Sequence, residues 1–358
     1  MPPIRVLLVE DSPVVLIILK RIFVSSPEIE VVGTAQNGLD ALELIPKIQP
    51  DVICTDLHMA QMNGLEFIRE VMAKFPRPIL VISASVQAED TYNVFQLLEA
   101  GAVDVFPKPT SGCASDYEQL KLELTAKIKV LSGVKVFTRH QRNKEVGTQR
   151  SNYQSLITHH QLPITNNKSQ IIKVVAIGAS TGGPQALHAI ISQFPANFPV
   201  PIICVQHISE GFLKGLVDWL ASGCKLPVKI AAAGELPQPG NVYFPPEKRH
   251  LQLDKTGRFI YSSGLPLNGH CPSVSVTFNS VASFYSRSAA GVLLTGMGKD
   301  GADGMLSIAQ AGGLTIAQDE TTSIVFGMPK EAIALGAVQH ILPINAIAPL
   351  LLSKILNR

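Results

Sequence analysis

The stretch Val174-Val-Ala-Ile-Gly-Ala-Ser-Thr-Gly-Gly-Pro184 runs from an apolar β-strand through a sharp turn into a helix. Gly178 and Gly182 flank Ser180 at the G-x-S-x-G spacing of a nucleophile elbow, which exposes the serine hydroxyl where the helix begins. Unpaired backbone N–H groups at that point can hold a developing oxyanion. A dinucleotide-binding turn needs glycine where Ser180 stands. The stretch therefore predicts an α/β sheet that carries a nucleophilic serine, with an ordinary glycine-rich turn as the alternative.

Two further apolar strands are predicted to bring a histidine and a carboxylate to the same sheet edge. A helix is expected at Gln185–Gln193, and the strand Pro201–His207 ends on a histidine. A third strand, Gly291–Thr295, leads into a turn that contains Asp300. Because sites in parallel α/β sheets assemble at the carboxyl ends of strands, these side chains are expected to lie near the serine.

These three side chains have the chemistry of a catalytic triad. Ser180 is the predicted nucleophile, His207 the general base and Asp300 the carboxylate that orients the base. Asp303 competes with Asp300 as the acid, and residue chemistry alone does not separate them. The histidine precedes the acid in the chain, which excludes the usual α/β-hydrolase order of serine, acid and histidine.

Length and composition predict two cytosolic globular domains. The chain has 358 residues, of which 46% are hydrophobic and 16% charged, so each of two domains can bury a core. A net charge of +2 is too small to indicate a nucleic-acid or membrane-surface binder. We find no apolar run of transmembrane length and expect no signal peptide. The five cysteines lack C-x-x-C spacing, which predicts reduced thiols in the cytoplasm rather than disulfides or a zinc site.

Strand and helix alternate regularly through residues 1–130, which predicts a doubly wound parallel sheet in the first domain. Five short β-branched runs carry this pattern: Ile4–Val9, Val31–Ala35, Asp51–Thr55, Pro78–Ser83 and Val103–Phe106. Residues 131–172 are rich in Gln, Asn, Thr, Ser and His and are predicted to be an interdomain linker. The alternation resumes at Lys173, so residues 173–358 are expected to form a second doubly wound domain.

Polar residues follow the strands of the first domain at one edge of the predicted sheet: Glu10, Asp11, Asp56, Ser83 and Lys108. Three crowded carboxylates repel one another unless a hard cation such as Mg²⁺ joins them. A nearby lysine and hydroxyl complete a cradle for a phosphoryl group carried on one carboxylate.

Residues 3–130 resemble the response-regulator receiver domain. The motifs that carry the resemblance are Leu8-Val-Glu-Asp-Ser12, Asp56-Leu-His-Met59, Gly64, Ser83-Ala84, Gly101-Ala-Val-Asp104 and Lys108-Pro109. The resemblance implies that Asp56 is the phosphoacceptor and that Mg²⁺ is held by Glu10, Asp11 and Asp56. It also implies three switch residues: the Ser83 hydroxyl, the Phe106 ring and the Lys108 ammonium.

Residues 173–356 resemble the catalytic domain of the chemotaxis protein-glutamate methylesterases. The motifs are Gly178-Ala-Ser-Thr-Gly-Gly-Pro184, Gln206-His207, Thr295-Gly-Met-Gly-Lys-Asp-Gly301 and the stretch from Gln318 to Pro329. The resemblance assigns the catalytic acid to Asp300, and it implies that Thr181 and the Met297 backbone belong to the oxyanion site. Lys214 and Ser275 depart from the family pattern at positions outside the triad, which makes them candidates to line the substrate groove.

The joint resemblance implies a phosphorylation-activated hydrolase of glutamyl γ-methyl esters on chemoreceptor helices, which also deamidates glutamine. It implies a chemotaxis histidine kinase as phosphodonor, methyl-accepting chemoreceptors as substrate, and no cofactor in the esterase site. The first domain is expected to restrain the second until Asp56 is phosphorylated. A DNA-binding output domain is disfavoured by the near-neutral charge, and a degenerate partner-binding domain is disfavoured by the intact Ser180, His207 and Asp300.

Overall fold

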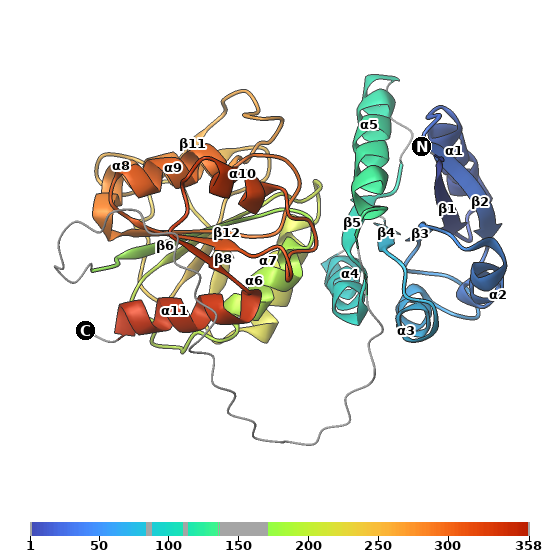
Figure 1. Cartoon of the computed structure of the whole chain (residues 1–358), viewed down its shortest axis with the longest axis horizontal. Helices are drawn as coiled ribbons and strands as arrows, with labels where there is room; N and C mark the ends of the chain where they lie inside the picture. Colours follow the sequence, from blue (N-terminus) through green and yellow to red (C-terminus); the bar gives the residue numbers. More distant parts are fainter. Residues whose placement is uncertain (1, 84–87, 110–113, 135, 137–170, 357–358) are drawn as a thin grey trace, which may run out of the picture. The chain divides into compact units, whose positions relative to one another are not determined.

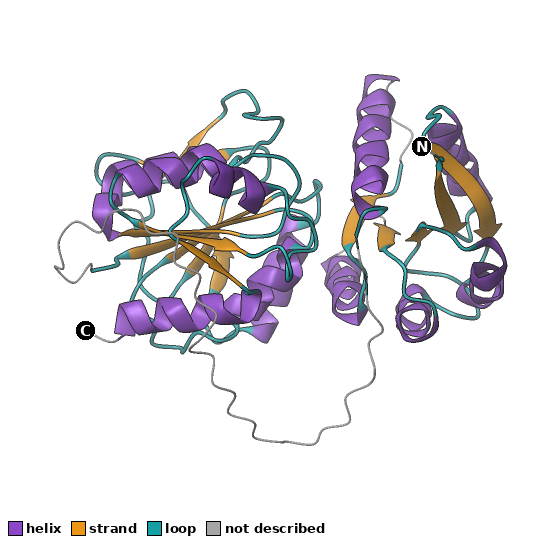
Figure 2. Ribbon diagram, viewed as in Figure 1, coloured by secondary structure: helices purple, strands orange, loops and turns teal. Residues whose placement is uncertain are grey.

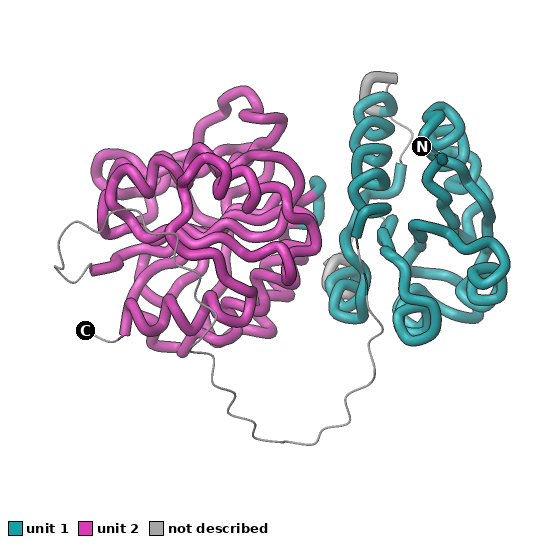
Figure 3. Tube along the Cα trace, viewed as in Figure 1, with its two compact units in different colours: residues 1–148, 209–212 teal, residues 149–208, 213–358 magenta. Residues whose placement is uncertain are grey.

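The computed structural model describes residues 2–83, 88–109, 114–134, 136 and 171–356. Two compact units divide the chain, residues 1–148 with 209–212 and residues 149–208 with 213–358 (Figure 3). Most of the predicted linker, residues 131–172, lies outside the described residues. The boundaries expected at 130 and 173 remain predictions.

The first unit alternates five strands with five helices. Their bounds are β1 (Ile4–Val9), α1 (Pro13–Val24), β2 (Ile29–Ala35), α2 (Gly38–Ile48), β3 (Val52–Thr55), α3 (Gly64–Lys74), β4 (Ile79–Ser83), α4 (Ala88–Ala100), β5 (Asp104–Pro107) and α5 (Ala114–Leu131). The strands pair in parallel in the order β2-β1-β3-β4-β5. The predicted (βα)5 sheet is confirmed.

Polar side chains cap the first three helices. The side chains of Ser12, Asn37 and Asn63 each accept a hydrogen bond from a backbone N–H in the first turn of α1, α2 and α3. Such caps satisfy donors that a helix cannot satisfy within itself. The carboxyl ends of β1 and β2 therefore lead quickly into helices, whereas residues 56–63 separate β3 from α3.

The second unit is built on a larger parallel sheet. Its first elements are β6 (Val174–Ala179), α6 (Gly183–Ile191), β7 (Ile202–Gln206), α7 (Leu213–Gly223), β8 (Val228–Ile230), β9 (Val242–Phe244), β10 (His250–Leu253) and β11 (Phe259–Ser262). Then follow α8 (Val274–Tyr285), the 3-10 helix η1 (Ser286–Ser288), β12 (Ala289–Leu293), α9 (Ala302–Gln310), β13 (Leu314–Gln318), α10 (Met328–Ala334), β14 (His340–Leu342) and α11 (Ile344–Leu356). Seven strands pair in the order β14-β13-β12-β6-β7-β9-β8, and every pairing is parallel.

Helices cover both faces of this sheet, as predicted for a doubly wound domain (Figure 2). Figure 1 shows α8, α9 and α10 on one face and α6, α7 and α11 on the other. Strands β6, β7 and β12 are buried along their whole length, because helices exclude water from both sides of them.

One part of the second unit differs from the expected alternation of strand and helix. Residues 228–262 contain β8, β9, β10 and β11 without an intervening helix, and β10 and β11 form an antiparallel pair apart from the main sheet. The segment between β8 and β9 contains Pro237, Pro239 and Gly240, which disfavour a helix. No helix among the described residues has the length and hydrophobicity needed to cross a membrane.

Candidate functional site

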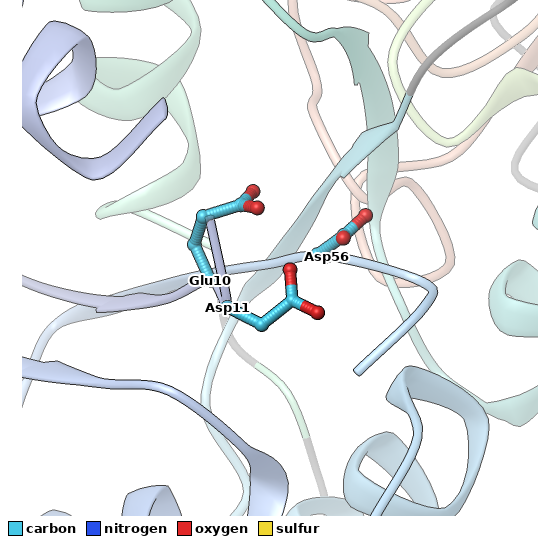
Figure 4. A group of neighbouring side chains, drawn as sticks. All are labelled: Glu10, Asp11 and Asp56. Atoms are coloured by element: carbon cyan, nitrogen blue, oxygen red, sulfur yellow. The ribbon is translucent and has the colours of Figure 1, made fainter. Parts of the chain in front are cut away.

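Three carboxylates meet at the carboxyl edge of the first sheet. Glu10 and Asp11 follow β1, and Asp56 follows β3. One oxygen of each lies within 4.8 Å of one from each of the others, and Figure 4 shows the three side chains gathered together. Glu10 and Asp56 are 2% and 3% exposed, whereas Asp11 is exposed. The cluster has two buried members and one member open to an incoming group.

Lys108 neutralises part of this negative charge. Its Nζ lies 2.9 Å from Glu10 Oε1 and 2.7 Å from Asp56 Oδ2. Burial raises the pKa of Asp56 and of Glu10, although the ion pairs with Lys108 oppose the shift. Burial lowers the pKa of Lys108, but its two carboxylate partners outweigh burial and raise it. Lys108 therefore remains a cation fixed between the two buried acids.

The donor set fits a hard divalent cation. Oε2 of Glu10 is buried and has no hydrogen-bond partner among the described residues. A buried carboxylate oxygen without a partner is costly unless a cation or water satisfies it. Carboxylate oxygens are the protein ligands that Mg²⁺ prefers. The residues that the sequence singled out as metal ligands lie together and leave an oxygen free for that role.

The predicted switch residues lie on or just after β4 and β5, the two strands that follow β3 in the sheet order. Ser83, 2% exposed, ends β4, and its carbonyl accepts a hydrogen bond from the N–H of Lys108. Phe106, 1% exposed, lies in β5 opposite Ile82. Gly64 is required beside Asp56, since a Cβ there would come within 2.4 Å of the Asp56 carbonyl oxygen.

In the second unit, Ser180 follows β6 and precedes α6. The N–H of Ser180 donates to the carbonyl of Thr295 at 3.0 Å, and the Ser180 carbonyl accepts from Gly183 at 2.7 Å. Gly182, the N-cap of α6, has a φ of 76°, a conformation that glycine adopts without strain. The turn therefore holds the serine between the end of β12 and the start of α6.

Two residues next to the serine turn have backbone N–H groups that are free to bind an oxyanion. In the described part of the chain, the N–H groups of Thr181 and Met297 donate no hydrogen bond. Gly296 packs against the nucleophile turn, because a Cβ at that position would come within 2.7 Å of the Ser180 Cβ. Thr181 is 7% exposed, and Met297 is 45% exposed. Unpaired backbone donors close to a serine are the components from which oxyanion holes are built.

His207 and Asp300 form a direct pair, with Nε2 of His207 2.9 Å from Asp300 Oδ2. A carboxylate only accepts hydrogen bonds, so Nε2 carries the proton and Nδ1 carries the lone pair of the neutral ring. Nδ1 is buried and has no hydrogen-bond partner among the described residues, the Ser180 hydroxyl included. The nitrogen that can accept a proton is therefore Nδ1.

Asp300 is enclosed by donors at the N-terminus of α8. Oδ1 accepts from Ser273 Oγ at 2.8 Å, from the Ser275 N–H at 3.1 Å and from the Gly301 N–H at 3.0 Å. Oδ2 accepts from the Val274 N–H at 2.7 Å in addition to His207. Burial raises the pKa of Asp300, but His207 and these donors outweigh it and hold the pKa below its usual value. The acid is therefore ionised and fixed in orientation.

The close approach of α8 to the serine strand depends on one glycine. A Cβ at Gly178, in β6, would come within 2.3 Å of Val274 Cγ1. Glycine at this position lets the first turn of α8 lie against the strand that carries Ser180. The same Val274 donates its N–H to Asp300.

Three residues of this site were not among the predicted site residues. His270 stacks on His207 with ring centroids 3.7 Å apart. His250 is buried and its Nδ1 accepts from the Ser273 N–H. Nε2 of Gln206 donates to the carbonyls of Ser180 and His207, both at 2.8 Å. Gln206 stood in a motif of the family resemblance, but nothing in the local sequence marks either histidine.

The other residues that the sequence singled out lie elsewhere. Asp303 is exposed in the first turn of α9. Lys214 pairs with Asp218 one turn along α7, and both side chains are exposed. Ser275 is 1% exposed behind the acid, where its Oγ accepts from the Gly301 N–H at 2.7 Å. Ser275 therefore contacts the support of Asp300 and does not line an open groove.

The two sheets and their edge residues define the class of protein, a response regulator whose output domain is a serine hydrolase. The family model "Response regulator receiver domain" matches residues 6–113, and "CheB methylesterase" matches residues 175–351. A "Protein-glutamate methylesterase/protein-glutamine glutaminase 1" of Syntrophus aciditrophicus is 41% identical over 348 residues, 97% of each chain. The chain belongs to the protein-glutamate methylesterase/protein-glutamine glutaminase family.

Further comparisons agree with this membership. A protein-glutamate methylesterase/protein-glutamine glutaminase of Nitrosospira multiformis is 39% identical over 355 residues, 99% of this chain and 98% of its own. The crystal structure of the Thermotoga maritima CheB methylesterase catalytic domain superposes with a TM-score of 0.50 at 41% identity. It covers 51% of this chain and 99% of that one. The family predicted from the sequence is confirmed.

Proposed function

We propose that this chain hydrolyses glutamyl γ-methyl esters on chemoreceptor cytoplasmic helices, with Ser180 as nucleophile, His207 as base and Asp300 as acid. The observation that carries the proposal is the His207–Asp300 pair, which leaves a buried proton acceptor, Nδ1, in the domain that holds the serine elbow. The partners are the methylated receptors and, for the receiver domain, a chemotaxis histidine kinase. The proposed location is the cytoplasm.

The first half of the reaction acylates the enzyme. Nδ1 of His207 takes the Ser180 hydroxyl proton as Oγ attacks the ester carbonyl carbon. The carbonyl oxygen becomes an oxyanion, which the N–H groups of Thr181 and Met297 stabilise. The carbonyl re-forms as the C–OCH₃ bond breaks, and His207 returns its proton to the leaving methoxide. Methanol departs and a glutamyl ester of Ser180 remains.

The second half restores the enzyme. Water takes the place of methanol, His207 accepts one of its protons, and the oxygen attacks the acyl carbon. The bond to Ser180 Oγ breaks, His207 protonates that oxygen, and the glutamate carboxyl is released. The same residues deamidate a glutamine when the leaving group is ammonia in place of methanol. Asp300, ionised within its donors, stabilises the imidazolium in every step.

The receiver domain supplies the regulation in this proposal. Glu10, Asp11 and Asp56 would hold Mg²⁺, which when bound offsets the charge of the carboxylates and the incoming phosphoryl group. The Asp56 carboxylate is the proposed phosphoacceptor. Lys108 already forms an ion pair with this carboxylate and would pair with the phosphoryl oxygens. Ser83 and Phe106, on β4 and β5, are the proposed residues that respond to phosphorylation.

The test is methanol release from a purified methylated receptor domain. Wild-type protein, phosphorylated with a small phosphodonor and Mg²⁺, is expected to release methanol and to raise receptor mass by one unit at each deamidated glutamine. Ser180→Ala is expected to do neither. A wild-type protein that leaves methylated receptor unchanged would refute the proposal.

A further inference from the structure

His250 is a buried histidine that the triad does not include, and both of its ring nitrogens have partners. It begins β10 and is 2% exposed. The Ser273 N–H donates to Nδ1 at 3.1 Å, and Nε2 lies 3.3 Å from the Leu265 carbonyl oxygen. A backbone N–H only donates and a carbonyl only accepts, so the ring is neutral with its proton on Nε2.

The partner of Nδ1 leads directly to the catalytic acid. Ser273 is fully buried as the N-cap of α8, and its Oγ donates to Asp300 Oδ1 at 2.8 Å. The next two N–H groups along the chain, of Val274 and Ser275, also donate to Asp300. The position of the Ser273 backbone therefore determines where three hydrogen-bond donors to Asp300 lie. His250 in turn accepts the hydrogen bond from the Ser273 N–H.

The partner of Nε2 belongs to an exposed turn beside the base. Residues 263–269 are all exposed, and Leu265 is 91% exposed. Leu267 and His270 exchange backbone hydrogen bonds of 3.1 and 3.0 Å, and His270 stacks on His207. One imidazole thus joins the turn that precedes His270 to the donors that enclose Asp300.

We propose that His250 is a positioning residue for the reaction, acting on Asp300 through Ser273, an inference that rests on the proposed function. Without the Nδ1 lone pair, the buried Ser273 N–H has no acceptor, and the first turn of α8 must shift to find one. Displacements of about 1 Å in a catalytic group can cost on the order of a hundredfold in rate. The Nδ1 contact matters for catalysis, and the Nε2 contact serves the exposed turn.

Two isosteric variants separate these contacts. In His250→Asn, the side-chain oxygen takes the place of Nδ1 and still accepts from Ser273. In His250→Gln, the amide nitrogen takes the place of Nε2 and still donates to Leu265, but the Ser273 acceptor is lost. We expect His250→Gln to lower kcat for methanol release by about tenfold or more with KM nearly unchanged. We expect His250→Asn to restore kcat to within about threefold of wild type.

The same pair of substitutions at His340, at the start of β14, is the matched control and should leave kcat unchanged. Equal kcat values for wild type and His250→Gln, or equal losses in the Asn and Gln variants, would overturn the positioning role. The tautomer is tested in the wild type by ¹⁵N NMR of the imidazoles, where a proton on Nδ1 of His250 would also overturn it.

Methanol release by wild type and by Ser180→Ala is measured in parallel with these variants. If wild type releases no methanol, or Ser180→Ala releases it, the proposed function fails. If those two behave as expected while His250→Gln keeps the wild-type kcat, the failure belongs to His250 alone.

Discussion

The imidazole of His270 lies face to face with that of His207, with ring centroids 3.7 Å apart and planes 8° from parallel. Burial and the neighbouring His207 lower the pKa of His270 to about 4. Two stacked imidazolium rings would repel, and with this lowered pKa His270 is neutral near pH 7. In the proposed mechanism, a proton taken from Ser180 therefore remains on His207, where Asp300 stabilises it.

This stack predicts a pH dependence of stability. The unfolded chain protonates His270 near its ordinary value of 6.5, whereas the folded domain resists protonation down to about 4. Neutral His270 therefore makes its full contribution to the free energy of unfolding above pH 6.5. This contribution is lost as the pH falls from 6.5 to 4, and the loss is at most about 3 kcal/mol. His270→Phe keeps a ring in the stack without the titration, so its stability should fall less over this range.

The measurement is urea unfolding followed by tryptophan fluorescence. The chain has a single tryptophan, Trp219, which is 3% exposed in α7, so the signal reports on the catalytic domain. Asp300 titrates below this range because its pKa is lowered from 3.8. If the free energy of unfolding changes equally with pH in wild type and His270→Phe between pH 6.5 and 4, this account of the stack is contradicted.

Removing the nucleophile tests the triad. Ser180→Ala should lower methanol release by at least about 10³-fold while the unfolding midpoint stays near that of wild type. Adding His207→Ala to Ser180→Ala should cost little more, because the residues act as a unit. Ser353→Ala, in α11, is the control and should keep full activity. Methanol release by folded Ser180→Ala near the wild-type rate would disprove the assignment.

Phosphorylation is predicted at Asp56. With a small phosphodonor and Mg²⁺, intact-mass measurement should show one added phosphoryl group, and chelating Mg²⁺ should prevent it. Asp56→Asn should accept none, whereas Asp40→Asn, an exposed acid of α2, should behave as wild type. A full phosphoryl group on Asp56→Asn would place the acceptor elsewhere.

Gly296 is predicted to be indispensable for the serine turn. An added Cβ would come within 2.3 Å of Met328 Sδ and 2.7 Å of Ser180 Cβ, so Gly296→Ala must move the nucleophile or Met328. We expect a loss of about 1–3 kcal/mol in unfolding free energy and of about tenfold or more in kcat. Gly133→Ala, in the receiver unit, where a Cβ would meet the Val130 carbonyl oxygen at an ordinary 3.5 Å, is the control. Unchanged kcat in Gly296→Ala would exclude close packing as the reason for this glycine.

Restraint by the receiver domain predicts that separating the domains raises activity. The fragment 170–358 should hydrolyse receptor esters faster than the unphosphorylated full-length chain, and phosphorylation should narrow the difference. A change of a few kcal/mol in the restraint shifts the active population greatly. The measurement compares the rates of methanol release by the fragment and by the full-length chain at matched concentration. Full-length Asp56→Asn is the control, and the phosphodonor should not raise its activity. Equal rates for fragment and unphosphorylated chain would leave the receiver without an inhibitory role.

Much of the fold followed from local pattern. The apolar runs in the sequence predicted both ends of β1 correctly and each end of β7 to within one residue. They do so because a strand that is buried on both faces has a continuous apolar run. The alternation of strand and helix then required parallel sheets, whose carboxyl ends gather polar residues at one edge. That rule alone brought Asp56 close to Glu10, and His207 close to Asp300.

The pattern did not give the arrangement of residues 228–262, where four strands follow one another in place of the expected alternation of strand and helix. These strands are short and are separated by proline-rich turns, so each has too few consecutive buried residues to show a hydrophobic period. The antiparallel pair of β10 and β11 also depends on contacts between β10 and α8. Long-range packing decided that segment.

The chemistry of the site divides in the same way. Residue types determined that a serine, a histidine and carboxylates were available at the strand ends, because those positions follow from each strand's own sequence. Tertiary structure decided that Asp300 and not Asp303 bonds to His207, that Nδ1 is left as the acceptor, and that His250 and His270 support the pair. These relations join side chains from different strands and helices, and hydrogen-bond direction and ring stacking exist only once those elements have packed.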